Sequence, residues 1–193
     1  MKRLLSSTAL ALVAALALTA CGSGDSSGDG DGGGDFNDAD VTFTQSMIPH
    51  HEQAVQMAKM AKMHASTPEV KNLADKIEVA QGPEIATMKG WLKDWAKDES
   101  GSVGGMDHDS GGMDRGAMPG MMSDEDMSRL GVATGAGFDQ MFLTMMIDHH
   151  TGAIEMAKTE QSKGKNADAK ALAKKIEADQ TAEITQMKKL LSP

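Results

Sequence analysis

Cysteine and aromatic residues are scarce in this 193-residue chain. Cys21 is the only cysteine, which excludes a disulfide within one chain and any metal site built from several thiolates. Tyrosine is absent, and aromatic residues make up only 3% of the chain. This composition disfavours a β-sandwich, because strands favour aromatic and β-branched side chains. A core of Ala, Leu, Ile and Met instead favours closely packed helices.

Basic stretches and known catalytic motifs are also missing. The formal net charge is −9, and an acidic chain without a basic stretch argues against nucleic acid as a partner. The sequence has no nucleophile-elbow motif, no phosphate-binding loop and no Glu-x-x-His. Because these patterns carry hydrolytic, phosphoryl-transfer and di-iron chemistry, their absence favours a binding protein over an enzyme.

The first 21 residues are typical of an export signal, with a basic start at Lys2 and Arg3 and an apolar run over residues 10–18. The run is shorter than the about 20 residues that a transmembrane helix needs. It ends in Leu-Thr-Ala-Cys, which resembles a bacterial lipoprotein signal; the alternative is an ordinary cleaved signal with an incidental cysteine. We therefore predict that the protein is exported and is anchored to the outer face of the cell membrane through a lipid on Cys21. The Gly/Ser/Asp residues 22–35 cannot bury a core and predict a flexible tether.

An internal repeat organises the rest of the chain. The segment MIPHHEQAVQMAK at residues 47–59 recurs as MIDHHTGAIEMAK at residues 146–158. Without a gap, residues 40–92 align with residues 139–191, and 22 of these 53 positions are identical. Self-similarity at a fixed offset predicts that each copy is one supersecondary unit.

Each copy predicts a helical hairpin. Apolar or small residues recur at alternating steps of four and three from Phe43 to His64 and again from Phe142, which is the spacing of one helix face. Pro49 should kink the first helix, and Gly82–Pro83 should interrupt the second. We predict an all-α fold, an antiparallel four-helix bundle over residues 36–193 with pseudo-twofold symmetry. Its parts are repeat one at 40–97, a Met-rich linker without stable structure at 98–122, a short helix at 123–132 and repeat two at 135–193.

The two His-His pairs concentrate the metal-binding chemistry. The first histidine of each pair faces inward on the apolar stripe, and the second lies about 100° round, on its shoulder. One inward histidine is more often a hydrogen-bonded core residue. Two adjacent pairs, each with a methionine one turn before and another two turns after, favour metal binding instead. The predicted ligands are His50, His51, Met47, Met57, His149, His150, Met146 and Met156.

Polar residues also fall on the apolar stripe of the second helix of each hairpin. These residues are Glu84, Glu183, Gln81 and Gln180. A carboxylate buried alone is very costly. Each glutamate is therefore expected to pair with a ligating imidazole or to bind metal directly; the alternative is a glutamate that reaches solvent at the end of the bundle.

Methionine decides which metal the sequence predicts. Imidazole suits zinc, copper, iron and nickel, whereas thioether ligands select copper, Cu(I) above all. Helical methionines are more often core residues, but the Gly-rich insert has no core to fill. An accessory capture set is predicted there and at the end of the first helix: Met60, Met63, His64, Met106, His108, Met113, Met118, Met121 and Met122. Copper is the predicted metal, Cu(I) ahead of Cu(II), with iron and zinc less favoured.

The paired M-I-x-H-H-x-x-A-[VI]-x-M-A-K segments and the SDEDMSRL…GAGFDQMF approach to the second resemble the bacterial family called domain of unknown function 305. The resemblance covers residues 36–193. It implies an exported, ferritin-like four-helix bundle, associated in some members with copper binding and copper tolerance. By position, the resemblance implies a set of metal ligands in this chain: His50, His51, Met57, His149, His150 and Met156.

The leading hypothesis is a copper-binding lipoprotein that sequesters copper or transfers it to or from a partner protein. Histidine must be neutral to bind a metal, so binding is expected to weaken below about pH 6. Two alternatives stay open. One is a redox-active, ferritin-like di-metal enzyme, and the other is a metal-free interaction bundle whose histidines only satisfy the core.

Overall fold

The computed structural model describes residues 35–99 and 118–192. Within these two stretches the chain forms five helices and no strand: α1 (Asp38–His64), α2 (Pro68–Asp94), α3 (Asp124–Val132), α4 (Gly135–Lys163) and α5 (Ala167–Leu191). The predicted all-α fold is confirmed. The predicted signal, the lipidated Cys21, the tether and the insert residues Met106, His108 and Met113 lie outside the described residues. No helix of the described part is both long and apolar enough to cross a membrane.

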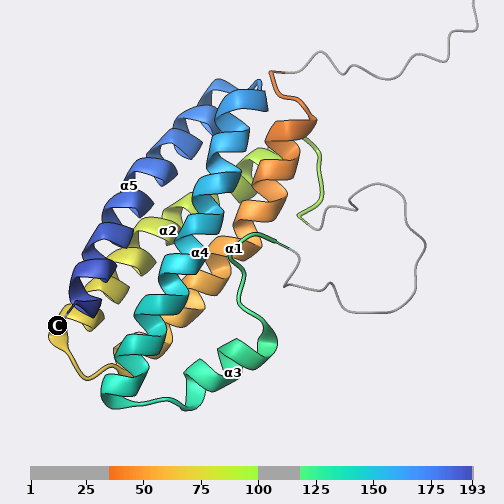
Figure 1. Ribbon diagram of the computed structural model, residues 1–193. Helices are drawn as coiled ribbons and strands as arrows, with labels where there is room; N and C mark the ends of the chain where they lie inside the picture. Colours follow the sequence, from red (N-terminus) through yellow and green to blue (C-terminus); the bar gives the residue numbers. More distant parts are fainter. Residues whose placement is uncertain (1–34, 100–117, 193) are drawn as a thin grey trace, which may run out of the picture. The chain divides into compact units, whose positions relative to one another are not determined.

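The two halves of the repeat form two helical hairpins. α1 pairs with α2 and α4 pairs with α5, and the hairpins meet mainly through α1 and α4 (Figure 1). α1 and α4 run antiparallel, because the end of α1 lies beside the start of α4, where Ala65 and Gly135 form an isolated bridge. α2 and α5 pack against this central pair and make little contact with each other.

Most helix boundaries follow local sequence signals. Asn37 forms a capping box with Asp40 at the start of α1, and the side chains of Ser123 and Asn166 accept hydrogen bonds at the starts of α3 and α5. Pro68 occupies the first turn of α2, where its missing N–H costs nothing.

Gly82 and Pro83 do not break the second helix. α2 continues through Gly82 and Pro83 from Pro68 to Asp94, although this dipeptide was expected to interrupt it. Ile77 and Met88, on either side of Pro83, are both fully buried. Packing on both sides of the proline holds the helix together despite the lost hydrogen bond.

The core consists of two clusters separated along the central helices by the His-His pairs. One cluster includes Met57, Phe138, Phe142 and Met146, and the other includes Met47 with residues of the first turns of α1 and the later turns of α4. Since the histidines lie between these clusters in both α1 and α4, they occupy the middle of the contact between the hairpins.

Two buried aspartates tie the hairpins together. Asp40 on α1 accepts hydrogen bonds from the backbone N–H groups of residues 165–166, in the turn before α5. Asp139 on α4 accepts hydrogen bonds from the backbone N–H groups of residues 66–67, in the turn before α2. The two aspartates are equivalent positions of the sequence repeat, so each hairpin caps the turn of the other.

Candidate metal centre

Four imidazoles are buried together at the middle of the α1–α4 contact. His50, His51, His149 and His150 have no exposed surface. The ring centroids of His50 and His149 lie 3.8 Å apart, and those of His149 and His150 lie 6.4 Å apart. His51 and His150, expected on the shoulder of the stripe, are fully buried because the second helix of each hairpin also covers them. The fold therefore brings both His-His pairs into one cluster.

Each outer imidazole pairs with a glutamate of its own hairpin. His51 Nε2 lies 2.9 Å from Glu84 Oε2, and His150 Nε2 lies 2.6 Å from Glu183 Oε2. A carboxylate accepts, so each imidazole donates through Nε2–H and keeps the lone pair on Nδ1. Glu84 is 8% exposed, so the alternative of a solvent-reaching glutamate does not hold for it.

Lys175 on α5 completes the surroundings of Glu84. Its Nζ lies 2.8 Å from Glu84 Oε1. Burial alone would raise the pKa of Glu84, but the hydrogen bonds from His51 and Lys175 outweigh burial and hold this pKa below its usual value. Glu84 is therefore ionised at neutral pH, and the proton between it and His51 belongs to the imidazole.

Burial favours the neutral form of three imidazoles in the cluster, those of His50, His51 and His149. Burial, and to a smaller extent electrostatic repulsion from His51, lowers the pKa of His50 to about 3. Burial also lowers the pKa of His51, although the neighbouring Glu84 acts to raise it. Burial, followed by the proximity of His50, holds the pKa of His149 well below its usual value. Neutral imidazole is the form that binds metal ions. In the folded protein, protonation should therefore reach His50 only well below the pH of about 6 expected from an ordinary histidine pKa.

Several ring nitrogens of the cluster are buried without a hydrogen-bond partner. Within the described residues these are Nδ1 of all four histidines and Nε2 of His149; both amide atoms of Gln81 and Oε1 of Gln180 are also unpartnered. The His50 backbone slightly raises the pKa of His149, against the lowering effect of burial. It does not form a hydrogen bond of ordinary geometry with the His149 ring. An unpartnered buried polar atom costs about 1–3 kcal/mol. Five such nitrogens in one cluster fit a site that takes a metal ion.

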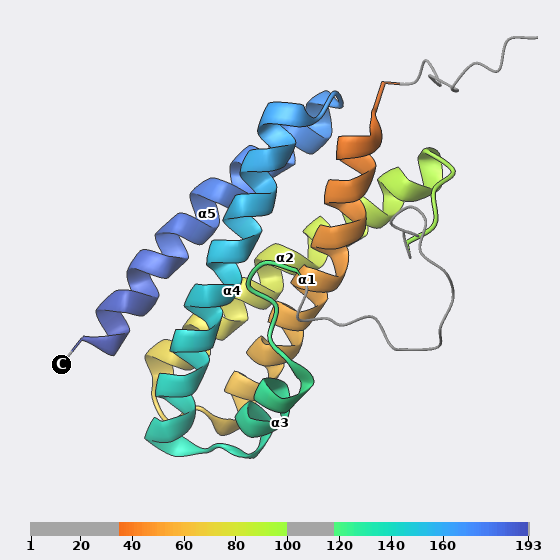
Figure 2. The same ribbon diagram turned by 45° about the vertical axis from the view of Figure 1, so that its right-hand side comes forward.

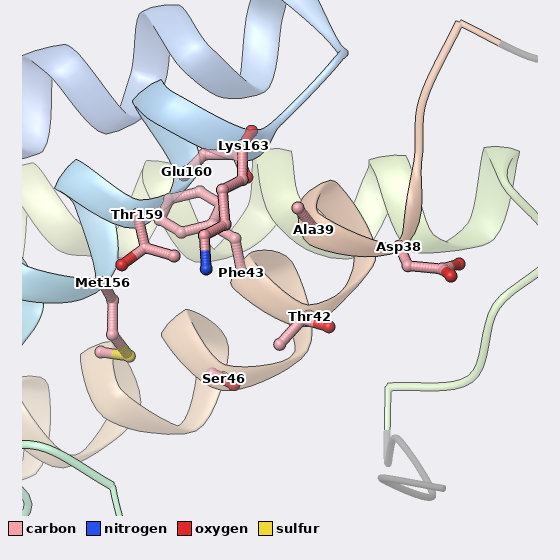
Figure 3. A pocket seen from close by; sticks show the side chains of 9 residues that line it. All are labelled: Asp38, Ala39, Thr42, Phe43, Ser46, Met156, Thr159, Glu160 and Lys163. Carbon is pink, nitrogen blue, oxygen red and sulfur yellow. The ribbon is translucent and has the colours of Figure 1, made fainter.

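The four predicted methionine ligands lie at two levels. Met47 and Met146 are fully buried and precede the histidines by three residues, about 4.5 Å along the helix axis. Met57 and Met156 lie seven residues beyond His50 and His149, roughly 10 Å along the axis. Met57 is buried in the core, and Met156 lines a surface pocket between the start of α1 and the end of α4 (Figure 3). Of the four predicted methionine ligands, Met47 and Met146 thus lie nearer to the histidines along the helices.

Imidazole and carboxylate groups alone do not form a ready metal site. In residues 35–99 and 118–192, no three His, Cys, Asp or Glu side chains come together in a way that could hold a metal ion. A metal ion bound here would need thioether ligands, or a movement of the rings, to complete its coordination. The same arrangement disfavours the di-metal enzyme, because its site needs four glutamates and two histidines around the metals.

Comparison with known proteins places the chain in a family. Residues 40–191 match the family model described as Domain of unknown function (DUF305). The chain belongs to this family. A DUF305 protein from Streptomyces coelicolor, described as secreted, is 32% identical with a TM-score of 0.70, over 79% of this chain and 91% of that one. A DUF305 fragment from Deinococcus radiodurans is 26% identical with a TM-score of 0.68, over 80% and 96%.

A third similar structure contains a metal. CopM in its Cu(II)-bound form is 35% identical to this chain with a TM-score of 0.64, over 78% of this chain and 94% of CopM. CopM has also been solved in a Cu(I)-bound form. No protein of curated function matches this chain significantly.

The predicted accessory residues of this DUF305 protein on α1 lie away from the histidine cluster. Met60 packs against the core, Met63 is 70% exposed, and the ring of His64 lies 5.7 Å from that of Phe138. They follow His50 by at least ten residues, which is about 15 Å or more along the helix. The structure does not bring these three residues to the cluster.

The end of the insert packs on the bundle instead of remaining unstructured. Met118 is half-buried, and Met121 and Met122 are each 9% exposed. The amide of Gln53 donates to the carbonyl oxygen of Met122 at 2.9 Å and accepts from its N–H at 2.8 Å. The expectation that these methionines have no packing role is wrong, because the α1–α4 face supplies the core that the insert itself lacks.

Proposed function

We propose that this protein binds copper at the buried histidine cluster and holds or transfers it outside the cytoplasm. The observation that carries the proposal is the group of five buried, unpartnered imidazole nitrogens at the α1–α4 contact. A neutral imidazole can donate the lone pair of its unprotonated ring nitrogen to a metal ion. The Cu(II)-bound and Cu(I)-bound forms of the similar CopM support copper as that ion.

The donor set explains the choice of copper. His50 and His149 face each other, and Met47 and Met146 are the buried sulfur atoms nearest to them along the helices. Imidazole with thioether favours copper over zinc, and thioether favours Cu(I). Glu84 and Glu183 orient the outer imidazoles and raise their basicity, as carboxylates behind metal-bound histidines do.

An exported location fits this role. The signal-like residues 1–21 and the described secretion of the Streptomyces relative support export. A lipid on Cys21 would keep the bundle at the outer face of the membrane, and Met60, Met63 and His64 would serve as accessory sites. A copper donor or acceptor protein is the expected partner.

An anaerobic Cu(I) titration against a competing chelator tests the copper site. Replacing both inner imidazoles, in the double variant His50→Gln/His149→Gln, should raise the Kd for Cu(I) on the order of 100-fold. Gln140→Ala is the control, because Gln140 is exposed on α4 and belongs neither to the cluster nor to the accessory residues, and it should leave the Kd within about threefold. Wild-type affinity in a double variant whose circular dichroism shows an intact helical fold would contradict the proposal.

A further inference from the structure

A short segment crosses the histidine cluster. Residues 118–122, called the strap here, run across the face formed by α1 and α4 before the chain enters α3 (Figure 2). The carbonyl oxygen of Pro119, in the strap, lies 3.0 Å from Nε2 of His50. The strap therefore reaches a candidate ligand directly.

Two positions hold the strap in place, one on each central helix. On α1, Gln53 forms two hydrogen bonds with the backbone of Met122. On α4, Gly152 leaves room for the strap, since a Cβ atom there would lie 1.9 Å from the Pro119 carbonyl oxygen. Gly120, with φ of +75°, turns the strap against α4, where its own Cβ atom would lie 2.5 Å from the Asp148 carbonyl oxygen.

These two positions are equivalent in the sequence repeat. Gln53 follows His50 by three residues, and Gly152 follows His149 by three residues. In the first copy the Gln53 side chain forms hydrogen bonds with the strap. In the second copy Gly152 has no side chain, which leaves space for the strap. The strap thus breaks the pseudo-twofold symmetry at the cluster. It gives His50 a hydrogen-bond partner, whereas neither ring nitrogen of His149 has one among the described residues.

The chemical consequence concerns the tautomer of His50. A proline carbonyl can only accept a hydrogen bond, so the proton of neutral His50 must lie on Nε2, and Nδ1 must carry the lone pair. We propose that the strap, held by Gln53 and Gly152, is a positioning element that fixes His50 in the Nε2–H tautomer and thereby makes Nδ1 its metal-binding atom. His149, which has no such partner, binds through either nitrogen.

This inference rests on the proposed copper site, but it makes a claim about the metal-free protein that can be tested separately. Long-range ¹H–¹⁵N spectra of the full chain report which nitrogen of each histidine carries the proton. Wild-type His50 should show the Nε2–H pattern. Gly152→Ala, which pushes the Pro119 carbonyl away, and Gln53→Ala, which releases Met122 without adding bulk, should each convert this signal to a mixture of tautomers.

The same variants should bind copper more weakly. Loss of a group that orients a liganding histidine typically costs 10–100-fold in metal affinity, so the Kd for Cu(I) should rise by about that factor. Gly137→Ala is the matched control: it makes the same change in the same helix, at a glycine with nothing within 4 Å of the added Cβ atom. It should leave the tautomer and the Kd unchanged.

The outcomes separate the two proposals. An Nδ1–H pattern for His50 in the wild type, or an unchanged Nε2–H pattern in both strap variants, overturns the role of the strap whatever the copper affinity. If the strap variants bind Cu(I) as the wild type does while His50→Gln/His149→Gln does not, the strap inference fails and the copper site stands. If the wild type binds no Cu(I) at the histidines, the proposed function fails, and the tautomer spectra still decide whether the strap positions His50.

Discussion

Lowering the pH from 7 to 5 should destabilise the metal-free bundle by about 3 kcal/mol. Burial lowers the pKa values of His50, His51 and His149 in the folded protein, whereas the unfolded chain titrates near 6.5. The stability that these neutral imidazoles contribute is therefore fully present above about pH 6.5. It is lost as the pH falls further, down to about 3 for His50. If all three imidazoles stay neutral in the folded protein at pH 5, each costs about 2 kcal/mol there, at about 1.4 kcal/mol per pH unit.

Glu160 opposes this loss. Burial, with smaller contributions from the neighbouring Asp40 carboxyl and its charge, raises the pKa of Glu160 to about 8 from an ordinary value of 4.5. Its contribution is fully present below pH 4.5 and is lost as the pH rises through 8. Lowering the pH from 7 to 5 therefore increases the contribution of Glu160 to the stability of the fold by about 3 kcal/mol. The pKa values of Asp40, Asp139 and Glu84 are lowered, so these groups add their own loss only below about pH 4.5.

Urea unfolding at pH 7, 6 and 5 measures this balance, and two variants separate its parts. Glu160→Gln removes the opposing contribution and should deepen the loss to about 6 kcal/mol. His50→Gln/His149→Gln leaves one shifted histidine against Glu160, so its stability should change by about 1 kcal/mol or less over the same range. A wild-type stability that is equal at pH 7 and pH 5, with Glu160→Gln behaving in the same way, would show that the buried histidines do not resist protonation.

The features that could be predicted from the sequence depend on local signals or on the repeat. The caps at Asn37, Ser123 and Asn166 are short-range hydrogen bonds, so the residue types alone indicate where the helices begin. The meeting of His50 with His149 follows from the helical period and the sequence repeat, because equivalent inward residues of two antiparallel hairpins face each other across a pseudo-twofold axis.

The features that sequence reasoning missed depend on long-range contacts at positions where the two copies differ. Gln53 and Gly152 share nothing in residue type, and their common role becomes visible only once the strap lies between them. Glu160 corresponds to Ala61 in the first copy, so the repeat gave no reason to expect a buried carboxyl there. Met121 and Met122 were misread because a glycine-rich context indicates no core of its own, although α1 and α4 supply one.

Asp40→Ala should destabilise the protein by about 4 kcal/mol at pH 7, more than an exposed salt-bridge residue would. Asp40 is fully buried, and it accepts hydrogen bonds from the backbone N–H groups of Asn37 at 2.6 Å, Lys165 at 3.1 Å and Asn166 at 2.9 Å. Truncation removes the acceptor of these three N–H groups. Each hydrogen bond lost at this partly buried turn costs about 1–3 kcal/mol. Urea unfolding of the metal-free protein at pH 7 measures the loss.

Asp139→Ala is the matched comparison. It removes the carboxylate that accepts hydrogen bonds from two backbone N–H groups and from the Ser66 hydroxyl. Its cost at pH 7 should therefore be similar. The two variants should differ in pH dependence, because Asp40 faces the Glu160 carboxyl and raises its pKa, whereas Ala61 occupies the equivalent position in the other half. Asp40→Ala should therefore deepen the loss between pH 7 and pH 5 by less than Glu160→Gln does, because burial still raises the pKa of Glu160, and Asp139→Ala should keep the wild-type profile. A cost below 1 kcal/mol for both variants would mean that water satisfies the two turns, and that the hairpins are held together by the α1–α4 core alone.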